Sequence, residues 1–356
     1  MEFYLINYQQ IILSCVCLFV TTFTLTHLVR FLAIHKNILD IPNKRSSHQM
    51  PMPRGGGIAI VLTFVVALIW FAIVGVFPWN LTIALLGGGT LIAIIGHIDD
   101  VYRLRASLRM IAHFVAASWA VYWIGGLTIL DLGTWKFILA TQGTFLAIIG
   151  IVWCINLYNF MDGIDGLAGS EGMFIAIASG YALYASYHAN LALLMWLFAA
   201  MIAGFTVVNW PPAKIFLGDV GSGFIGYVFS VMAIFTANQA LLPINFWLIL
   251  LAIFLCDATF TLINRARRGE VLHAAHREHA YQQLVIYGMS HKQVTLGVLL
   301  VNVCILLPLA YSSLHWPMHS FWMMSFVILG LLIAWAIIQF NIRSLNQNPA
   351  SEQGMS

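Results

Sequence analysis

The hydrophobic residues of the chain fall into long continuous runs that short polar segments separate. These runs do not alternate apolar and polar positions with a period of two, so they favour membrane-spanning helices over the strands of a barrel. A helix needs roughly 20 mostly apolar residues to cross a bilayer. The pattern predicts about eleven such helices, over residues 9–33, 56–77, 80–97, 107–125, 137–156, 170–187, 190–209, 220–238, 243–264, 293–311 and 320–341.

The composition agrees with this picture. Of the 356 residues, 61% are hydrophobic and 8% are charged, whereas a soluble globular protein has about 45–50% apolar and about 25% charged residues. Such a chain cannot cover its surface with polar groups in water, which excludes a soluble enzyme, a disordered chain and a nucleic-acid-binding module. We therefore predict one all-α polytopic membrane domain over residues 1–345, followed by a polar cytoplasmic tail over residues 346–356.

The distribution of basic residues predicts the orientation. If the N-terminus lies outside, 15 of the 16 Lys and Arg residues fall on the inner side and only Lys136 falls outside. Loops on the cytoplasmic side are normally the ones enriched in Lys and Arg. An odd number of spans then places the C-terminus in the cytoplasm. Most acidic residues gather at the same inner ends, in four constellations.

The first constellation is the pair Asp99 and Asp100 at the exit of a predicted span. Adjacent carboxylates repel each other, and burial would raise the pKa of one of them. A divalent cation, a phosphate-bound metal or the nearby Arg103 and Arg105 would relieve this repulsion. A solvated loop with local ion pairs fits the spacing as well.

The second constellation has a polar side chain at every third position, namely Asn156, Asn159, Asp162 and Asp165. This spacing allows a helix or tight turn to present them on one side. Glycines between and after them permit a phosphate or sugar to approach the backbone. Amide and carboxylate oxygens suit Mg²⁺, which normally keeps waters and substrate phosphate oxygens. The alternative is a structural polar turn.

The third constellation combines Lys214 with the segment Gly218-Asp219-Val-Gly-Ser-Gly just before a predicted span. The glycines indicate a backbone shaped to admit phosphate. Asp219 could instead only cap the helix that follows. The chain has no G-x-x-x-x-G-K-[ST] sequence, which excludes a nucleotide-hydrolysing P-loop.

The fourth constellation crowds arginines and histidines into one loop. Guanidinium groups hold phosphate oxygens through paired hydrogen bonds, so we expect a phosphate-bearing substrate here. Contact with lipid headgroups and a zinc site are the alternatives, and no H-E-x-x-H sequence supports zinc. The residues are Arg265, Arg267, Arg268, His273, His276, Arg277 and His279.

Two further segments carry polar groups. Asp257 lies inside the predicted span 243–264, where a carboxylate is costly and is expected to face a polar cavity or a partner; the alternative is a hydrogen-bonded packing residue. The first inner loop carries Arg45, His48 and Arg54 among hydroxyl groups and glycines. These residues can contact an anionic lipid head.

Taken in chain order, these motifs resemble those of the polyprenyl-phosphate N-acetylhexosamine-1-phosphate transferases, the glycosyltransferase family 4 type. The resemblance covers roughly residues 35–285, and the joint occurrence of the motifs is specific. The opening patterns Asp40-x-Pro and Pro53-Arg54-Gly-Gly fit as well. The motifs are Asp99-Asp100, Asn159-x-x-Asp162-Gly-x-Asp165-Gly, Gly218-Asp219-x-Gly221-Ser222 and His276-x-x-His279.

The resemblance implies a phosphoglycosyltransferase that moves an N-acetylated hexosamine-1-phosphate from a UDP-sugar to undecaprenyl phosphate and releases UMP. It implies Mg²⁺, which Mn²⁺ can replace, held by Asp219 and Asn159. Asp99, Asp100, Asp219, His276 and His279 are the implied catalytic residues. Together with the constellations above, the expected substrate contacts are Asn156, Asp162, Asp165, Lys214, Arg265, Arg268, Arg277, Arg45, His48, Arg54 and Asp257.

The resemblance also implies a multi-pass protein of the bacterial inner membrane with an active site facing the cytoplasm, in contact with membrane lipids and able to form a homodimer. Bacterial relatives often carry a third histidine in the last motif, where this chain has Arg277-Glu278. This fits the subgroup that starts O-antigen synthesis on N-acetylated 6-deoxyhexosamines. The expected donor sugar is GlcNAc, GalNAc or a 6-deoxy analogue such as FucNAc or QuiNAc. The alternative function is a membrane transporter of an anionic solute, which predicts polar sites near the bilayer midplane.

Overall fold

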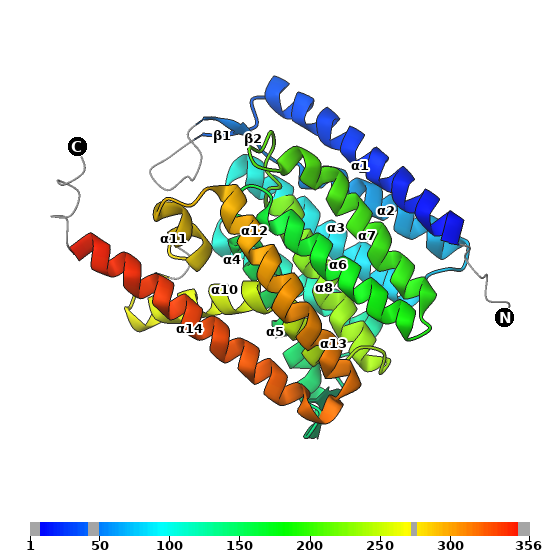
Figure 1. Ribbon diagram of the computed structural model, residues 1–356. Coiled ribbons are helices and arrows are strands. Elements are labelled where there is room, and N and C mark those ends of the chain that lie inside the picture. Colours follow the sequence, from blue (N-terminus) through cyan, green and yellow to red (C-terminus); the bar gives the residue numbers. More distant parts are fainter. Residues whose placement is uncertain (1–7, 42–49, 272–275, 348–356) are drawn as a thin grey trace.

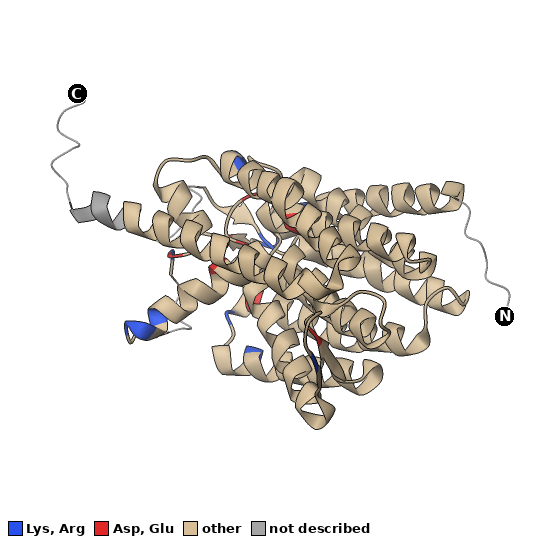
Figure 2. Cartoon of the chain, turned by 60° about the horizontal axis from the view of Figure 1, so that its bottom comes forward, with Lys and Arg blue, Asp and Glu red and all other residues tan. Residues whose placement is uncertain are grey.

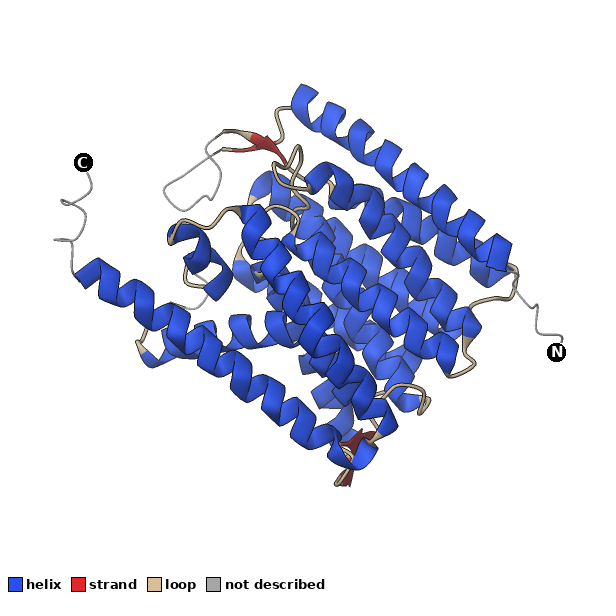
Figure 3. Ribbon diagram, in the orientation of Figure 1, coloured by secondary structure: helices blue, strands red, loops and turns tan. Residues whose placement is uncertain are grey.

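The protein is a bundle of long helices in a computed structural model that describes residues 8–41, 50–271 and 276–347 (Figure 3). The helices are α1 (Tyr8–His35), α2 (Gly57–Ile73), α3 (Trp79–Tyr102), α4 (Ala106–Ile124), α5 (Ala140–Phe160), α6 (Leu167–Ala185), α7 (Ala189–Asn209), α8 (Asp219–Asn238), α9 (Ile244–Leu250), α10 (Ala252–Arg267), α11 (Ala280–Ile286), α12 (His291–Val301), α13 (Leu307–His315) and α14 (Ser320–Gln347). A π-helical turn η1 (Asn302–Leu306) joins α12 to α13, and a 3₁₀ turn η2 (Pro317–His319) precedes α14. The predicted all-α fold class is confirmed.

Two short antiparallel hairpins lie at opposite ends of the bundle (Figure 3). In the first, β1 (Leu39–Asp40) pairs with β2 (Met52–Pro53), and Leu39 lies opposite Pro53. In the second, β3 (Ile129–Asp131) pairs with β4 (Lys136–Ile138), and Asp131 forms an ion pair with Lys136 at 2.8 Å. The first hairpin therefore marks the end of the bundle at which the polar motifs gather.

Each of the predicted apolar runs corresponds to a helix or to a consecutive pair of helices in the described chain. Seven of the described helices are long and apolar enough to cross a membrane, or eight if a sharply bent pair counts as one span. Helix α2 has 17 residues and falls just short in length. The count of eleven spans and the orientation of the termini therefore stay predictions.

The predicted span over residues 243–264 is not one continuous helix. The chain forms α9 and α10 there, and these two helices meet at an angle of 76°. Helix α9 is enclosed by the bundle, with Phe246 and Trp247 fully buried. Helix α10 lies across the bundle (Figure 1), and its Asp257 and Arg265 bond to groups in the segment 270–281. Bonds to this segment thus hold α10 at its angle to α9.

Helix α8 is the centre of the core. All its residues from 220 to 236 are buried, and α3 and α5 pack closely along it. Aromatic side chains fill the space around it, since Phe224 contacts Phe64 and Phe198 edge-on. The hydroxyl of Tyr227 donates to the carbonyl of Ala84 in α3 at 2.7 Å. A helix enclosed in this way presents its first turn at a fixed place beside the end of α3.

Close contact between α3 and α8 depends on Gly96. A Cβ atom at this position would lie 2.6 Å from the carbonyl oxygen of Asp219, at the start of α8. Because glycine has no Cβ, the last turn of α3 can lie directly on the first turn of α8. This contact brings Asp99 and Asp100 next to Asp219.

We predict that Gly96→Ala destabilises the protein and separates these two helix ends. Overpacking a closely packed contact costs about 1–3 kcal/mol, so the thermal unfolding temperature in detergent is expected to fall. Gly150→Ala in α5 is the matched control, because a Cβ there meets no other atom within 4 Å, and alanine favours a helix by up to about 1 kcal/mol over glycine. Equal unfolding temperatures for the two variants would contradict the role of Gly96.

Candidate active site

Three carboxylates meet where α3 ends and α8 begins, and Arg54 joins two of them. The Nε of Arg54 lies 2.9 Å from Oδ1 of Asp100, and its Nη2 donates to Oδ1 of Asp219 at 2.7 Å. The Asp100 side chain is almost fully buried, while that of Arg54 is partly exposed. Asp99 lies beside this pair at the same end of α3. The structure therefore brings the first and third predicted motifs together.

Arg109 of α4 makes the second bridge. Its Nη1 donates to Oδ2 of Asp99 at 2.6 Å and to Oδ2 of Asp219 at 3.3 Å. Both oxygens of Asp219 thus face a guanidinium group, one from Arg54 and one from Arg109. Sequence reasoning counted Arg109 only among the inward-facing basic residues and missed this role. We name Asp99, Asp100, Asp219, Arg54 and Arg109 the charged cluster.

Backbone N–H groups satisfy the remaining oxygens of the Asp99-Asp100 pair. Oδ1 of Asp99 accepts from the N–H of Leu104 at 2.5 Å. The two oxygens of Asp100 accept from the N–H groups of Asp219 and Val220 at 2.9 and 3.4 Å. Asp100 therefore caps the N-terminus of α8 from a neighbouring helix, where a carboxylate stabilises the helix dipole. The N-cap residue of α8 itself is Gly218, which has no side chain to cap the helix.

Backbone pairing places Arg54 over the cluster. The N–H groups of Gly56 and Gly57 donate to the carbonyls of Phe216 and Leu217, each at 2.9 Å, and Phe216 donates to the carbonyl of Pro53 at 2.9 Å. The segment before α2 therefore lies along the segment before α8. Gly218 follows with a φ of +77°, which favours glycine, and a Cβ there would lie 2.4 Å from Oδ2 of Asp100.

The expected neighbours Arg103 and Arg105 do not make these ion pairs. Both are exposed in the turn between α3 and α4. Arg103 ends α3 with a φ of +52°, which reverses the chain. The first turn of α4 then returns Arg109 over Asp99. The alternative of a solvated loop is excluded for Asp99, which is buried.

The two asparagines of the second motif have different partners. Asn159 Nδ2 donates to Oγ of Ser222 in α8 at 3.2 Å, and the same side chain hydrogen-bonds to Asp219. Asn156 lies one turn earlier in α5. Its Nδ2 donates to the carbonyl of Val152 at 2.7 Å and lies 3.1 Å from Nδ1 of His113. Asn159 thus joins the charged cluster, and Asn156 lies beside it against α4.

Asp162 follows α5 in the loop before α6 and interacts electrostatically with the charged cluster. Burial raises its pKa well above the ordinary carboxyl value; Arg54 acts in the opposite direction, and the carboxylates of Asp219, Asp100 and Asp165 raise the pKa further. A carboxyl group in such a position binds a proton or a cation more readily than an exposed one.

Asp165 faces away from Asp219, toward other loops. Its Oδ2 accepts from the N–H of Ala213 at 3.1 Å and lies 3.3 Å from Nδ1 of His291. Its carbonyl accepts from Thr295 Oγ1 at 3.1 Å. These bonds hold the loop against the segment before α8 and against α12. The expectation that all four polar residues of the second motif face one side is therefore wrong, because the helix ends at Phe160 and the loop turns.

Other predicted contacts lie farther out. Lys214 has an exposed side chain, and its carbonyl accepts from Nε of Arg30 at 3.1 Å. Arg45 and His48 lie outside the described residues. The carbonyl of Arg277 accepts a hydrogen bond from the side chain of Gln283.

The arginines of the fourth motif form ion pairs with two glutamates. Arg265 is buried, and its Nη1 lies 2.6 Å from Glu278 and 3.0 Å from Glu270. Arg268 pairs with the same two residues. Burial would raise the pKa of Glu278, but Arg268 and Arg265 lower it below the ordinary value. Sequence reasoning took the arginines as phosphate ligands and missed that Glu270 and Glu278 compensate them.

His276 and His279 lie together, with ring centroids 4.9 Å apart. His279 is buried and stacks on Phe160 at the end of α5, with centroids 6.1 Å apart. The hydroxyl of Tyr281 donates to the carbonyl of Phe160 at 2.9 Å. The histidine loop, residues 276–281, therefore packs against the end of α5, within the second motif.

Asp257 makes three hydrogen bonds. Its oxygens accept from the N–H groups of Ala280 and Tyr281 at 2.8 and 3.3 Å and from Oγ1 of Thr261 at 3.2 Å. These bonds agree with the alternative interpretation, in which Asp257 is a hydrogen-bonded packing residue. A direct contact of Asp257 with substrate stays a prediction.

Charged residues gather at helix ends and in loops, and long stretches of helix carry none (Figure 2). The charged cluster lies at the ends of α3 and α8 rather than midway along them. A transporter predicts polar groups near the middle of its helices, so this placement favours an enzyme at a membrane surface.

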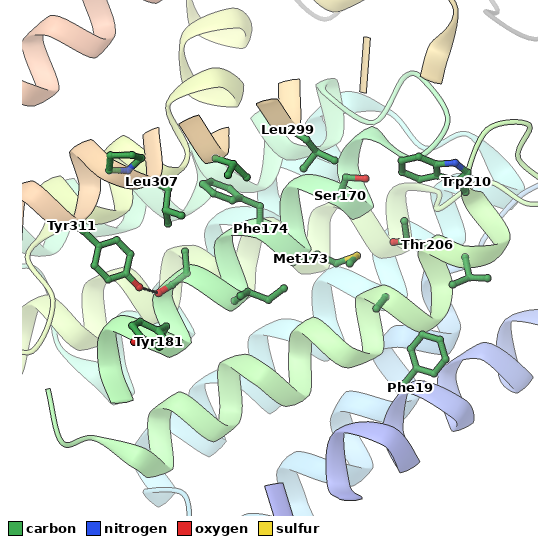
Figure 4. A pocket seen from close by; sticks show the side chains of 16 residues that line it. Phe19, Ser170, Met173, Phe174, Tyr181, Thr206, Trp210, Leu299, Leu307 and Tyr311 are labelled. Carbon is green, nitrogen blue, oxygen red and sulfur yellow. Dashed lines mark hydrogen bonds between the residues drawn. The ribbon is translucent and has the colours of Figure 1, made fainter. Parts of the chain in front are cut away.

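A large cavity lies apart from the charged cluster. It has a volume of about 1050 Å³, and its lining is almost entirely apolar, from α1, α6, α7, α12 and α13. Trp210 lies near one end and Tyr181 and Tyr311 near the other (Figure 4), and Tyr311 donates to the carbonyl of Ala178 at 2.7 Å. With Ser170 and Thr206 as its small polar residues, the cavity suits apolar chains and has no group for phosphate chemistry.

The donor set around Asp219 fits Mg²⁺. One carboxylate and the amide oxygen of Asn159 are hard ligands, and Mg²⁺ usually takes one or two protein carboxylates together with waters and phosphate oxygens. Among the described residues, no group of three or more His, Cys, Asp or Glu side chains converges on one point. The residues therefore fit an open site completed by substrate, and not a closed protein cage.

We predict that His276 contributes to stability in a pH-dependent way. Burial, together with His279 and Arg265, lowers its pKa to about 4, whereas an unfolded histidine has a pKa of about 6.5. The stabilisation by the neutral imidazole is present above pH ~6.5 and is lost as the pH falls toward ~4. Glutamine does not titrate, so the unfolding temperature of His276→Gln minus that of the wild type should rise as the pH falls from ~6.5 toward ~4. Parallel curves would contradict the lowered pKa.

Comparison with known proteins supports the resemblance seen in the motifs. Residues 82–237 match the model of glycosyl transferase family 4. The chain is 28% identical over 336 residues to a probable undecaprenyl-phosphate N-acetylglucosaminyl 1-phosphate transferase of Bacillus subtilis (strain 168), covering 92% of this chain and 91% of the relative. It is 26% identical over 353 residues to the undecaprenyl-phosphate alpha-N-acetylglucosaminyl 1-phosphate transferase of Escherichia coli (strain K12), covering 94% of each chain.

The family match spans α3 to α8, the part of the chain that carries Asp99, Asp100, Asn159 and Asp219. The relatives cover nearly the whole length, including the histidine loop. The match over residues 82–237 and the similarity to these relatives therefore support the polyprenyl-phosphate N-acetylhexosamine-1-phosphate transferase family, and the chain is a multi-pass membrane enzyme of the sugar-phosphate transferase class.

Proposed function

We propose that this protein transfers an N-acetylhexosamine-1-phosphate from a UDP-sugar to undecaprenyl phosphate and releases UMP. The observation that carries the proposal is the charged cluster, in which Asp99, Asp100 and Asp219 meet Arg54 and Arg109 at one end of the bundle. The names of the relatives support undecaprenyl phosphate as the acceptor and an N-acetylhexosamine 1-phosphate as the transferred group. A phosphoryl exchange between a sugar diphosphate and a lipid phosphate needs, above all, compensation of negative charge.

We propose Asp219 and Asn159 as the ligands of Mg²⁺. When bound, the ion would neutralise charge on the diphosphate oxygens as UMP leaves. Arg54 and Arg109 already lie against the carboxylates, so they can move a short way to phosphate oxygens and hold them with paired hydrogen bonds. His276 and His279 lie at the end of the second motif and would contact the donor diphosphate.

The lipid phosphate is the proposed nucleophile. The second pKa of a phosphate monoester is about 6, so this group is mostly dianionic at neutral pH and needs little help from a base. One of its oxygens attacks the phosphorus that bears the sugar, and the bond from that phosphorus to UMP breaks. Asp99, fixed by Leu104 and Arg109, would orient the attacking group or accept a residual proton. Asp219 is a poor nucleophile as a metal ligand.

The resemblance to the subgroup that starts O-antigen synthesis supports more detailed proposals about the donor sugar and the product. The chain has Arg277-Glu278 within the histidine motif, and Glu278 pairs with Arg265 and Arg268. We propose that the donor carries GlcNAc, GalNAc or a 6-deoxy analogue such as FucNAc or QuiNAc, and that the product starts an O-antigen or related envelope glycan. We also propose that the protein functions in the bacterial inner membrane, with a homodimer as its assembly.

We predict Mg²⁺-dependent UMP release from a panel of UDP-N-acetylhexosamines with undecaprenyl phosphate in detergent, and Mn²⁺ should replace Mg²⁺. Asp219→Asn should lower the rate at least about 100-fold, because it removes a charge that acts at the reacting phosphates. Asp131→Asn is the matched control, since Asp131 pairs with Lys136 in the hairpin at the other end of the bundle.

The same assay separates the two chemical routes. Direct attack predicts no UMP when the acceptor lipid is left out. A burst of UMP equal to the amount of enzyme would instead show a covalent aspartyl-phosphate intermediate. Full activity of a normally folded Asp219→Asn protein would contradict the metal assignment, and loss of activity in Asp131→Asn would show that the effect is not local to the charged cluster.

The orientation is testable with cysteines introduced singly at Arg105 and Lys136 in a chain without native cysteines. Both residues are exposed, beside the charged cluster and in the opposite hairpin respectively. With the active site in the cytoplasm, an impermeant thiol reagent added to intact cells should label the cysteine at 136 and leave the one at 105 unlabelled. The reverse result would place the site outside.

A further inference from the structure

The histidine loop is tied to the last helix of the chain, which lies outside the motifs. Nε2 of Gln339 in α14 donates to the carbonyl of Glu278 at 2.6 Å. One turn earlier, Nε1 of Trp335 donates to Oγ1 of Thr261 in α10 at 3.1 Å. Two side chains of α14 therefore reach polar groups, one in the histidine loop and one in α10.

The second of these bonds continues to Asp257. The hydroxyl of Thr261 donates to Oδ1 of Asp257 at 3.2 Å, and Asp257 accepts from the N–H groups of Ala280 and Tyr281. These are the first two residues of α11, whose N-cap residue His279 provides no side-chain cap. A carboxylate from α10 thus supplies the missing cap and fixes the direction in which the loop enters α11.

The same carboxylate lies beside the ring of His279. Nδ1 of His279 is 3.6 Å from Oδ1 of Asp257, and among the described residues this buried nitrogen has no hydrogen-bond partner. Phe160 and Tyr281 stack against the ring, with centroid distances of 6.1 and 5.8 Å. These two stacking contacts hold the plane of the His279 ring. Nδ1 then lies toward Asp257, and Nε2 lies on another side of the ring.

Packing alone holds α14 only loosely at this point. The partly buried positions of its inner half recur at Leu331, Trp335, Ile338 and Gln339, which is one face of a helix. A cavity of about 210 Å³ lies between this face and helices α10, α11 and α12. Because the apolar contact is incomplete, the two polar bonds contribute more to fixing the distance between α14 and the loop.

We propose that Asp257, Thr261, Trp335 and Gln339 form a positioning relay that sets the place and orientation of His279 for the donor diphosphate. The inference rests on the proposed function and adds to it the role of the last helix. The Asp257 carboxylate beside Nδ1 keeps this side of the ring turned toward α10. The other ring nitrogen, Nε2, is then turned toward the donor diphosphate. The relay residues are positioning residues, since they act through His279.

The test compares variants that remove one bond of the relay with variants that keep it. Thr261→Val, Trp335→Phe and Gln339→Met each remove a donor with little change of shape. Each should raise the KM for the best UDP-sugar by about 3–10-fold, the effect of one hydrogen bond. The KM for undecaprenyl phosphate and the kcat should change less than about twofold. All measurements use the full-length protein in detergent with Mg²⁺.

Two conservative variants serve as controls. Thr261→Ser keeps the hydroxyl and should behave as the wild type. Trp322→Phe changes the same residue type on α14 at an exposed position and should leave both KM values unchanged. An unchanged donor KM in all three relay variants would overturn the proposal. A parallel change of both KM values and kcat, together with a lower unfolding temperature, would also overturn it, because the residues would then be only structural.

Hydrogen exchange gives a readout that does not depend on turnover. The N–H groups of Ala280 and Tyr281 donate to Asp257, so they should exchange faster in Thr261→Val and Trp335→Phe than in Thr261→Ser. Equal exchange would overturn the relay. Absence of UMP release by the wild type would instead contradict the proposed function, and the exchange rates would still decide whether the relay exists.

Discussion

Three carboxylates at one end of a hydrophobic bundle stay ionised only if positive charge and hydrogen-bond donors compensate them. Isolated buried charges cost several kcal/mol each, and this protein meets the cost with Arg54, Arg109 and the backbone N–H groups at the start of α8. The architecture around the site follows from that requirement. The segment before α2 lies along the segment before α8, and α4 turns back over α3, because each must deliver a guanidinium group to Asp219.

The same principle operates a second time around the histidine loop. Arg265 and Arg268 are compensated by Glu270 and Glu278, and Asp257 is compensated by two backbone N–H groups and a hydroxyl. The two polar regions meet where Tyr281 bonds to the end of α5. The protein thus has two compensated charge networks that meet at the end of α5. In both networks, the phosphate oxygens of a substrate can take the place of carboxylate oxygens as partners of the arginines.

Much of this arrangement was predictable from the sequence. The apolar runs predict the helices because only helices bury a continuous hydrophobic backbone in lipid, and the motif order predicts the family. The sequence also placed Asp99, Asp100 and Asp219 on one face. Their ion-pair partners were not predictable. Arg103 is nearer to Asp99 along the chain than Arg109 is, and only the left-handed turn at Arg103 makes the more distant residue the contact.

Other differences have the same origin. Asp162 and Asp165 look equivalent in the sequence, but the end of α5 at Phe160 sends Asp165 toward Ala213 and His291. Asp257 lies in a run that reads as one span, and the 76° bend after α9 turns its helix across the bundle. Hydropathy records how apolar a segment is and not the direction in which it runs. Long-range partners, which the local pattern does not contain, determine that direction.

The enclosure of α8 has a consequence for biogenesis. A helix with buried residues from 220 to 236 has no face left for lipid in the finished protein, although it is apolar enough to enter a bilayer by itself. Its neighbours come from both sides in chain order, α2, α3 and α5 before it and α9 after it. During synthesis, α8 must therefore exchange lipid for protein contacts after insertion, and the charged cluster at its first turn is completed only in that late assembly step.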